Sequence, residues 1–402
     1  MILSRLRLHH SCLKKLARYL YVGLEYSQHF TALGKNWEHS FSSKPIAVLW
    51  GFSRWKWETM AKYLPEYRIL LVNSKKAWSK QRKILDRSKS LVFIVWGYQT
   101  KPEVVQYACD RGFPLYVMED GFIRSVDLGC KHTEAQSLVL DSRGIYFDAT
   151  RPSDLEHLLN TYDFSSPPAL LEVSAKLMAV MKTLGVSKYN FGERMQVRSI
   201  LGCKKDYRIL VIGQLESDAS LQYGLASDWT NMRLLQKAHE EHPKAEIIYR
   251  PHPDTLHLQR DDSTTRSVRE KTFYRTLTEP VMLADLFAEV DHVYTITSLS
   301  GFEALLHGLR VTVTGMPFYA GWGLTDDRQH CPRRVRRLTL EELFCAAYLL
   351  YPRYLANPQS PVTGCLETIC QVVSPRLELL SKDAPKNLDK WGSSQKTENK
   401  AR

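Results

Sequence analysis

From about residue 45 onwards, short apolar runs alternate with longer segments in which apolar residues recur at helical spacing. Each run ends in glycine, proline or polar residues, which is typical of buried parallel strands separated by helices. The first group of predicted strands comprises Pro45–Trp50, Arg68–Val72, Leu91–Trp96 and Pro114–Met118. We therefore expect an α/β domain with a parallel sheet in the first part of the chain.

A second α/β unit follows a long helical segment. Apolar spacing predicts a helix over Leu170–Leu184, and the glycine-containing, polar stretch Gly185–Lys205 is the expected crossing between the two units. The later predicted elements are the strands Arg208–Ile212, Ala245–Tyr249, Val293–Ile296 and Arg310–Val313 and the helices Asn231–Glu241 and Gly301–His307. The simplest architecture is two Rossmann-like domains, residues 41–195 and 196–360, that face each other across a cleft.

The two ends of the chain differ from this pattern. In residues 1–40, basic residues mix with leucines at roughly helical spacing, which fits a basic amphipathic helix on an anionic membrane surface or one packed on its own domain. Leu338–Tyr354 has the pattern of a last helix that returns across the domain junction. Residues 361–402 form a C-terminal extension, in which the polar, lysine-rich stretch after Ser381 predicts a disordered tail. No stretch is long and apolar enough to span a bilayer.

The chain of 402 residues is basic, with 55 lysines and arginines against 43 acidic residues and a formal net charge of +12. This excess points to anionic partners: nucleic acid, lipid head groups or phosphorylated substrates. Nucleic acid is the weakest of these, because the basic residues are scattered and form no aromatic–basic module. The eight cysteines lack zinc-site spacing and no signal peptide is evident, which predicts reduced thiols in the cytoplasm.

Polar residues follow several predicted strands, at the edge where open α/β sheets bind ligands. Glu119, Asp120 and Gly121 come after the strand that ends at Met118. Two carboxylates at a strand end, with a glycine that lets the backbone turn, can supply a general base. The alternative is a turn in which the aspartate caps a helix.

The loop 213–220 follows the first strand of the second domain and contains Asp218. With the predicted boundary, this loop opens into the cleft. Asp218 would then face the anomeric carbon of a sugar substrate, as a nucleophile or as an electrostatic stabiliser. The alternative is an ordinary helix N-cap formed by Ser217 or Asp218.

The sequence YRPHPD at 249–254 places Arg250 and His252 after a strand. Two prolines stiffen the loop around the histidine, and a guanidinium and an imidazole suit a phosphate group. A structural histidine in a stiff loop is the alternative.

A hydroxyl-rich turn containing Ser298 and Ser300 opens the helix that carries Gly301 and Glu303. Amides and hydroxyls at a helix N-terminus can bind phosphate, and Glu303 would accept hydrogen bonds from a ribose. Ordinary N-capping by either serine explains the hydroxyls equally well.

Together these sites place a carboxylate pair from one domain and a nucleotide-type phosphate site from the other on the same cleft, which is the layout of a two-Rossmann glycosyltransferase. The chain has no GxxxxGK[ST] loop, no GxGxxG after a strand and no DxD motif for a metal. Kinase, dehydrogenase and metal-dependent transferase functions are therefore disfavoured.

The run TSLSGFEALLHGLRVTVTGMPFYAGWGLTDD at 297–327 resembles the bacterial capsule polysaccharide synthesis family of the KpsC/LipA type. MEDGFIRSVDLG at 118–129, GQLESDAS at 213–220 and YRPHPD at 249–254 carry the same resemblance, which covers about residues 45–355 in order.

The resemblance implies a GT-B fold and a β-Kdo transferase that uses CMP-β-Kdo as donor. It implies transfer to a (lyso)phosphatidylglycerol-linked oligo-Kdo acceptor in capsular polysaccharide biosynthesis and export, with retention of the anomeric configuration by double displacement. Asp218 then becomes the nucleophile and Glu119 the general base, with Asp120 the second choice for the base. Burial beside Asp120 would raise the pKa of Glu119 toward neutrality, as a base requires.

The resemblance also implies a donor site. The EDG and HP pairs look like those of sialyltransferases that use CMP donors, so Arg250 and His252 would hold the phosphate and the donor carboxylate. The residues that would complete the donor site are Gln214, Ser220, Ser298, Ser300, Gly301 and Glu303. Because Arg, His and a helix N-terminus can neutralise the leaving phosphate, we expect no metal and no other cofactor.

Family members of this type carry two such modules, whereas this chain has one set of motifs, which fits a single-activity enzyme, half of a split pair, or the partner that adds the first Kdo. A different nucleotide-sugar donor and a non-catalytic export or assembly factor are the alternatives. The basic composition fits a lipid-linked acceptor, peripheral attachment to the inner membrane and contact with other capsule assembly and export proteins. The arginines at 310, 333, 334, 336 and 337 would bind an acceptor phosphate or an export partner, or form a solvated basic face.

Overall fold

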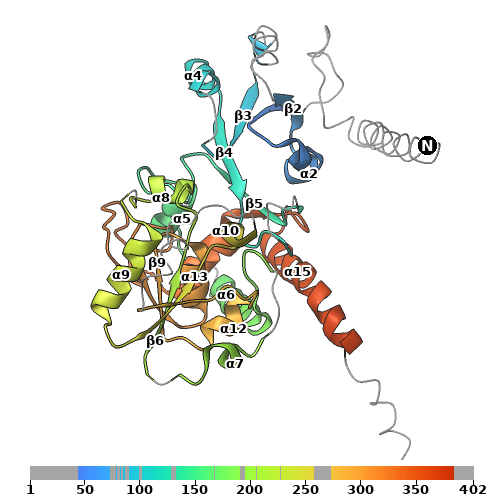
Figure 1. Cartoon of the computed structure of the whole chain (residues 1–402). Helices are drawn as coiled ribbons and strands as arrows, with labels where there is room; N and C mark the ends of the chain where they lie inside the picture. Colours follow the sequence, from blue (N-terminus) through green and yellow to red (C-terminus); the bar gives the residue numbers. More distant parts are fainter. Residues whose placement is uncertain are drawn as a thin grey trace, which may run out of the picture.

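The protein is described by a computed structural model over residues 44–383, apart from 73–77, 79–81, 83–84, 87–89, 99–101, 128–132, 167, 191–194, 205, 227 and 258–272. These residues form two six-stranded sheets with helices packed around them (Figure 1). The predicted fold class, α/β with two Rossmann-like domains, is confirmed.

The first sheet has the strand order β12-β5-β4-β3-β1-β2. Its four parallel strands are β1 (Ile46–Trp50), β2 (Arg68–Val72), β3 (Leu91–Trp96) and β4 (Leu115–Asp120). All five residues of β1 are buried, as expected for a central strand with both faces covered. The helices α2 (Trp57–Tyr63) and α4 (Pro102–Asp110) belong to this half, and β5 (Ser137–Asp141) pairs antiparallel with β4.

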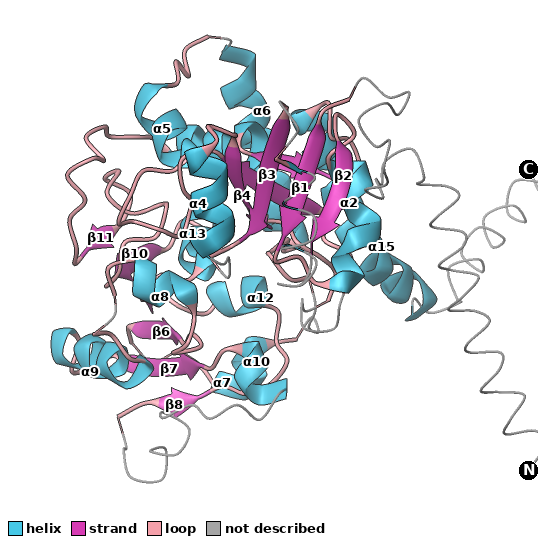
Figure 2. Cartoon of the chain, turned by 90° about the horizontal axis from the view of Figure 1, so that it is seen from above, coloured by secondary structure: helices cyan, strands magenta, loops and turns pink. Residues whose placement is uncertain are grey.

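The second sheet is parallel throughout, with the order β11-β10-β9-β6-β7-β8. Its strands are β6 (Arg208–Ile212), β7 (Glu246–Arg250), β8 (Arg275–Thr276), β9 (His292–Thr295), β10 (Arg310–Val313) and β11 (Asp326–Asp327). Numbered along the chain, this is the Rossmann order 3-2-1-4-5-6, whose direction reverses between β6 and β9. Ligands of such sheets bind at that reversal, so a ligand is expected to contact the loops that follow β6 and β9. Figure 2 shows the strands of the two sheets as separate groups.

Helices connect the strands of the second half. They are α7 (Val197–Leu201), α8 (Ala219–Tyr223), α9 (Asn231–Glu241), α10 (Pro253–His257), α12 (Leu283–Phe287) and α13 (Leu299–Leu306). Every predicted strand and the three predicted helices before residue 310 are present, with ends that agree to within two residues. The sequence analysis missed β5, β8, β11 and β12, which are antiparallel or only two or three residues long.

The prediction of one helix over Leu338–Tyr354 is wrong. The segment contains α14 (Leu340–Phe344), a π-helical stretch η4 (Cys345–Leu350) and the strand β12 (Pro352–Tyr354). Proline has no N–H group to continue the helical hydrogen bonds, and its ring clashes with the preceding turn, so the helix ends before Pro352. Tyr351, the residue before it, still has helical backbone angles. β12 then pairs antiparallel with β5 at the edge of the first sheet, a position that tolerates proline.

The chain therefore returns to the first sheet after completing the second. Beyond β12, α15 (Pro361–Asp383) contacts β12, η4 and α6 (Pro168–Leu184). The predicted C-terminal extension is thus helical as far as Asp383. The predicted tail beyond that residue and the predicted basic segment 1–40 lie outside the described residues.

One hydrophobic cluster spans both halves of the chain. It contains α6 and α5 (Asp154–Thr161) together with the strands β6, β9 and β10 and the segment α14–η4. Two smaller clusters pack on either side of β1 and β3, and Figure 1 shows β1–β4 standing apart from the rest. The predicted domain boundary at residue 195 stays a prediction, because the core is continuous across it.

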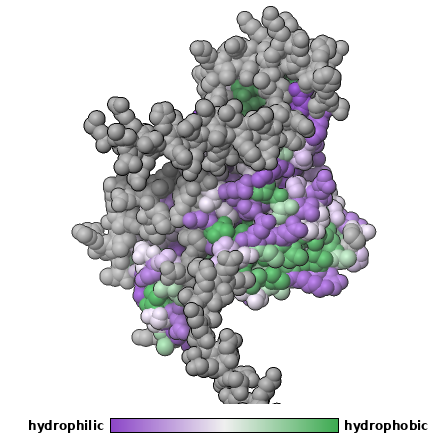
Figure 3. All heavy atoms as spheres, turned by 90° about the vertical axis from the view of Figure 1, so that its right-hand side faces the viewer, coloured by the Kyte–Doolittle hydropathy of each residue, from purple (hydrophilic) through white to green (hydrophobic). Residues whose placement is uncertain are grey.

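In the described range, no helix is long and apolar enough to cross a bilayer. On the face that Figure 3 shows, the described hydrophobic residues lie in groups separated by hydrophilic ones.

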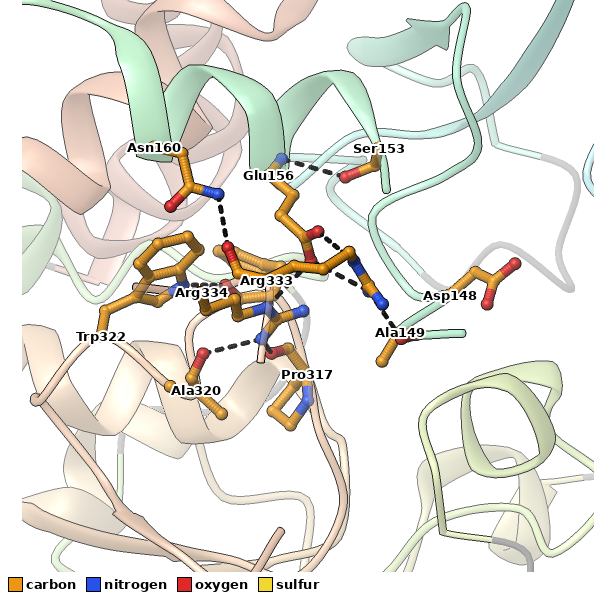
Figure 4. A network of polar contacts seen from close by, with 12 residues as sticks. Asp148, Ala149, Ser153, Glu156, Asn160, Pro317, Ala320, Trp322, Arg333 and Arg334 are labelled. Carbon is orange, nitrogen blue, oxygen red and sulfur yellow. Dashed lines mark hydrogen bonds and ion pairs between the residues drawn. The ribbon is translucent and has the colours of Figure 1, made fainter. Parts of the chain in front are cut away.

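A buried charge network joins the two halves (Figure 4). Glu156 on α5 is 5% exposed and accepts from Arg333 Nε at 2.6 Å and from Arg334 Nε at 3.1 Å. Arg334 Nη1 donates to the carbonyls of Pro317 and Ala320, beside the Trp322 ring. Each guanidinium thus satisfies one shared carboxylate and neighbouring carbonyls, which is the requirement for burying such charges.

This network corrects the expectation for the arginine group. Arg333, Arg334 and Arg336 are bonded inside the protein, since Arg336 Nη1 donates to the carbonyl of Tyr162 at 2.8 Å. They form neither a solvated basic face nor a docking site for phosphate. Of the five arginines, only those at 310 and 337 are exposed.

Removing the shared carboxylate should destabilise the fold. We expect Glu156→Ala to lower the free energy of unfolding in urea by about 3 kcal/mol, because the buried guanidinium of Arg334 and the partly buried one of Arg333 lose their shared counter-charge. Glu172→Ala, which removes the exposed α6 pair with Lys176 at 2.6 Å, is the matched control and should have no measurable effect. Equal losses in the two variants would show that the network does not hold the halves together.

Candidate active site

A cavity of about 630 Å³ lies between the two halves. It is lined by the ends of β3 and β4 from the first sheet and by the loops after β6, β7 and β9 from the second. The predicted site residues that line it are Glu119, Asp120, Gln214, Asp218, Ser220, Arg250, His252, Ser298, Ser300 and Glu303. Gly301 does not line it.

Glu119 and Asp120 are the last two residues of β4 and pair with Val139 and Leu138 of β5. No helix follows them, so the alternative in which the aspartate caps a helix is wrong. Asp120 N–H donates to Glu119 Oε1 at 2.9 Å. A Cβ on Gly121 would lie 2.4 Å from Ser137 Oγ, so glycine is needed here for close approach of the chain to β5.

Three cations surround the carboxyl pair. Arg124 is 1% exposed, and its Nε donates to Asp120 Oδ2 at 3.1 Å. Lys56 Nζ lies 3.9 Å from Asp120 Oδ1 and 2.9 Å from the centroid of the Trp96 ring. The third, Lys188, belongs to the loop after α6 and lines the cavity.

This environment gives the two carboxyl groups different pKa values. Burial, and then the charge of Asp120, raise the pKa of Glu119 to about 7. Burial acts in the same direction on Asp120, but Lys56, Arg124 and Lys188 outweigh it and lower the pKa of Asp120 below its usual value. Burial lowers the pKa of Lys56 to about 8. Near neutral pH, Asp120 is thus a fixed negative charge, while Glu119 is a group that can take up and release a proton.

Asp218 is the N-cap of α8, with Oδ1 accepting from Ser220 N–H at 2.8 Å. The N-cap alternative is therefore present in the structure. The same side chain also lines the cavity, as does the carboxyl pair of β4. Because the cap uses one oxygen, the second oxygen of Asp218 has no hydrogen-bond partner within the described ranges.

Gln214 ties together the two loops at the strand-order reversal. Its Oε1 accepts from Thr297 N–H at 2.7 Å, and its Nε2 donates to Thr297 Oγ1 at 3.0 Å. Ser220 Oγ lies 2.9 Å from the same threonine hydroxyl, and Asn231 makes two bonds at 2.9 Å to the Gln214 backbone. The polar groups of Gln214 thus hold the protein itself together, and its predicted contact with the donor stays a prediction.

At the end of β7, Arg250 Nη1 and Nη2 donate to the carbonyls of Glu279 and Val281. Over the described chain no carboxylate lies within ion-pair distance of this guanidinium. His252 Nδ1 accepts from Asp254 N–H at 3.1 Å, so the neutral ring carries its proton on Nε2, where it can donate to an anion.

Ser298 is the N-cap of α13, and its side chain accepts from Ser300 N–H at 3.2 Å. A Cβ on Gly301 would lie 2.2 Å from Tyr319 Oη, so this glycine is explained by packing behind the cavity. Glu303 Oε1 accepts from Lys188 N–H at 2.8 Å, and burial raises the pKa of Glu303 to about 7. Glu303 thus already holds a loop, which the sequence analysis did not anticipate.

Sequence reasoning missed several residues at or near the cavity. Lys188 lines it and Lys56 contacts the lining residue Asp120, and both lysines stand in segments without a motif. Tyr98, also in the lining, meets Tyr223 of α8 with ring centroids 4.7 Å apart. The local sequence does not predict these residues as part of the site, because contacts with residues distant in the sequence place them there. No group of three His, Cys, Asp or Glu side chains suited to a metal occurs among the residues described.

The buried carboxyl of Glu119 should make stability depend on pH. In the unfolded chain an ordinary glutamate loses its proton near pH 4.3, whereas the folded protein holds it to about 7, so stability falls as the pH rises between these values. We expect Glu119→Gln to raise the melting temperature relative to wild type at pH 8, and to raise it less at pH 5. A gain that is the same at both pH values would contradict the raised pKa.

Residues 92–354 match the family described as "Capsule polysaccharide biosynthesis protein". The lipopolysaccharide-processing protein LpsZ of Rhizobium meliloti is 41% identical over 326 residues, which are 81% of this chain and 73% of LpsZ. The capsule polysaccharide modification protein LipA of Neisseria meningitidis serogroup A is 34% identical over 80% of this chain, and the match spans 44% of LipA.

Two solved structures from Thermosulfurimonas dismutans KpsC are similar. Its β-Kdo 2,4 transferase has 34% identity and a TM-score of 0.69, and its β-Kdo 2,7 transferase has 30% identity and a TM-score of 0.60. Both matches cover 82% of this chain and 99% of the solved one. The chain therefore belongs to the capsule polysaccharide biosynthesis protein family and is of the LipA/KpsC type.

Proposed function

We propose that the protein is a retaining β-Kdo transferase that moves Kdo from CMP-β-Kdo to a lipid-linked Kdo acceptor in capsule synthesis. The observation that carries the proposal is one cavity in which a proton-accepting Glu119 from one domain faces Asp218, Arg250 and His252 from the other. The likeness to the two KpsC transferases supports the choice of donor and sugar.

In the first step, the free oxygen of Asp218 attacks the anomeric carbon of the donor sugar. The bond from that carbon to the CMP phosphate oxygen breaks, and CMP leaves with the electron pair. The N-cap bond to Ser220 fixes the attacking carboxylate in place. The result is a sugar linked to Asp218 with inverted configuration.

In the second step, an acceptor hydroxyl attacks the same carbon and gives its proton to Glu119. The bond to Asp218 breaks and the carboxylate is regenerated, so two inversions give net retention. A pKa of about 7 suits Glu119 to this task, because the group is available as a base near neutral pH and binds the proton strongly enough to remove it. Asp120, held ionised by Arg124 and Lys56, is the poorer base.

The leaving CMP needs positive charge around its phosphate. Arg250 and His252 supply donors from the end of β7, and Ser298 and Ser300 bring the positive end of the eight-residue helix α13 to the same cavity. These groups can stabilise the leaving phosphate without a metal ion.

The proposed acceptor and location follow from charge. A formal net charge of +12 favours an anionic lipid-linked acceptor and peripheral attachment to the anionic inner leaflet, on the cytoplasmic side. The chain spans less than half the length of the LipA protein that it matches. The single set of motifs in this chain fits one transfer activity and cooperation with other capsule assembly and export proteins.

Mass spectrometry of the intact protein tests the proposed nucleophile. Incubation with CMP-Kdo and no acceptor should add the mass of one Kdo residue to the wild type and nothing to Asp218→Ala. Glu119→Gln should still form this adduct, because Glu119 acts as a base only in the second step. The variant should also retain the adduct when acceptor is added, because it lacks that base. Circular dichroism of each variant checks that the fold is intact.

An adduct on folded Asp218→Ala would assign the nucleophile elsewhere. If the wild type forms no adduct and calorimetry detects no CMP binding, the chain is instead a non-catalytic assembly factor.

The pH dependence of kcat/KM tests the base. Since Glu119 must be deprotonated to act, the rate should rise with pH through about 7 in the wild type. Asp120→Asn removes a negative neighbour, lowers the pKa of Glu119 and should move this rise toward lower pH while activity persists. Loss of activity in folded Asp120→Asn, with activity retained in Glu119→Gln, would assign the base to Asp120.

A further inference from the structure

One charged side chain at the cavity has no role in the function proposed above. Lys188 lines the cavity beside Glu119 and Asp120, in the loop between α6 and α7. We propose that the Lys188 ammonium binds an anionic group of the acceptor, a carboxylate or a phosphate, and so holds the acceptor hydroxyl next to Glu119. This inference rests on the proposed function and assigns it an acceptor subsite.

The backbone of Lys188 is fixed from both halves of the protein. Its carbonyl accepts from Arg124 N–H at 2.9 Å and from Ser125 N–H at 3.2 Å, both just after β4. Its N–H donates to Glu303 Oε1 on α13 at 2.8 Å. A lysine side chain is long and flexible, so fixing its backbone at both peptide groups limits the volume that the ammonium can reach.

The neighbouring residues hold the loop in the same way. Asn190 Nδ2 donates to the carbonyls of Ser125 and Ser187, at 3.1 and 2.8 Å, and Tyr189 forms an isolated parallel bridge with Ser125. Lys188 thus projects from a rigid part of the cavity wall, which is what a specific binding group requires.

The Lys188 ammonium is charged, and its Nζ lies 5.7 Å from the centroid of the Tyr189 ring without a hydrogen bond to any described residue. Burial by itself lowers the pKa of Lys188, but Tyr146, Tyr189, Asp120 and Glu119 together raise it above its usual value. Across the described residues, no oxygen accepts a hydrogen bond from its Nζ and no carboxylate lies within 4.0 Å of it. An ammonium has three donors, so Lys188 can offer hydrogen bonds and a positive charge to an anionic ligand in the cavity.

The other cations on this side of the cavity are already committed. Arg124 is bonded to Asp120, Ser125 and Thr133 through its guanidinium. Lys56 is paired with Asp120 and the Trp96 ring. Lys188 is therefore the cation beside the proposed base that remains available for a ligand.

Position assigns this cation to the acceptor. Arg250 and His252 serve the donor phosphate from the second sheet, whereas Lys188 accompanies Glu119, which takes the proton from the acceptor hydroxyl. An acceptor that ends in an acidic sugar offers a carboxylate near that hydroxyl, and a lipid head group offers a phosphate. Both present oxygen acceptors to an ammonium, so the chemistry is shared and the experiment must separate the sources.

The test measures transfer from CMP-Kdo to four synthetic acceptors, in which the sugar carboxylate is present or replaced by a carboxamide and the lipid phosphate is present or absent. We expect Lys188→Met to raise KM for the fully anionic acceptor about 10- to 100-fold, the range for losing a hydrogen bond to a charged group. Its kcat and its affinity for CMP in calorimetry should stay close to wild type, and Lys188→Arg should recover part of the loss. Lys176→Met, at an exposed lysine on α6, is the matched control and should leave KM unchanged.

The group that binds Lys188 is identified by comparing KM values: its removal from the acceptor should raise KM in the wild type but not in Lys188→Met. Equal losses on all four acceptors, a fall in CMP affinity, or an unchanged KM would each overturn the inference. The wild-type comparison of the four acceptors decides even if the variant does not fold, because equal KM values there leave no anion for Lys188 to bind. Absence of any transfer by the wild type would instead overturn the proposed function, and the inference with it.

Discussion

The site depends on two adjacent carboxyl groups buried at the end of one strand. Burial alone would leave both protonated, and their mutual repulsion forbids two charges without compensation. Arg124 and Lys56 stabilise the charge of Asp120, and that fixed charge then helps to keep the proton on Glu119. The cations at this edge of β4 therefore give two chemically similar side chains different roles. The raised pKa that suits Glu119 to the proposed role of base thus follows from its burial and from the neighbouring charge of Asp120.

The second half of the site depends on the order of its strands. The direction of the Rossmann order reverses between β6 and β9, so the loops after these strands diverge and leave room for a ligand. Gln214 bridges the two loops through Thr297, which fixes the distance between the Asp218 cap and the N-terminus of α13. The side-chain amide of Gln214 thus positions Asp218 and the N-terminus of α13 relative to each other.

Much of the fold could be predicted because most parallel strands are short apolar runs, such as β1, that glycine, proline or polar residues separate from the helices. The predictions failed where structure depends on distant partners. β12 forms because it pairs with β5. Arg334 can be buried because it is bonded to Glu156, a residue 178 positions away in the sequence. The same holds for the site. Glu119 lies at the end of a strand and Asp218 in the loop after one, and this position singled both out in the sequence. Lys188 is placed by contacts with Arg124 and Glu303, which no local pattern shows.

The return of the chain to the first sheet has a consequence for how the cavity is held. β12 extends the sheet that carries Glu119, while η4 and α6 belong to the cluster that packs on the second sheet. The Glu156 network and the Lys188 backbone add polar links at two further points. If Asp218 and Glu119 act as the proposed nucleophile and base, the separation of these two side chains from different halves of the chain must be fixed to within a fraction of an ångström. The return of the chain through η4 and β12 and these polar links fix the two halves relative to each other. Because most of these contacts lie outside the cavity, polar side chains in its wall remain available to bind a substrate.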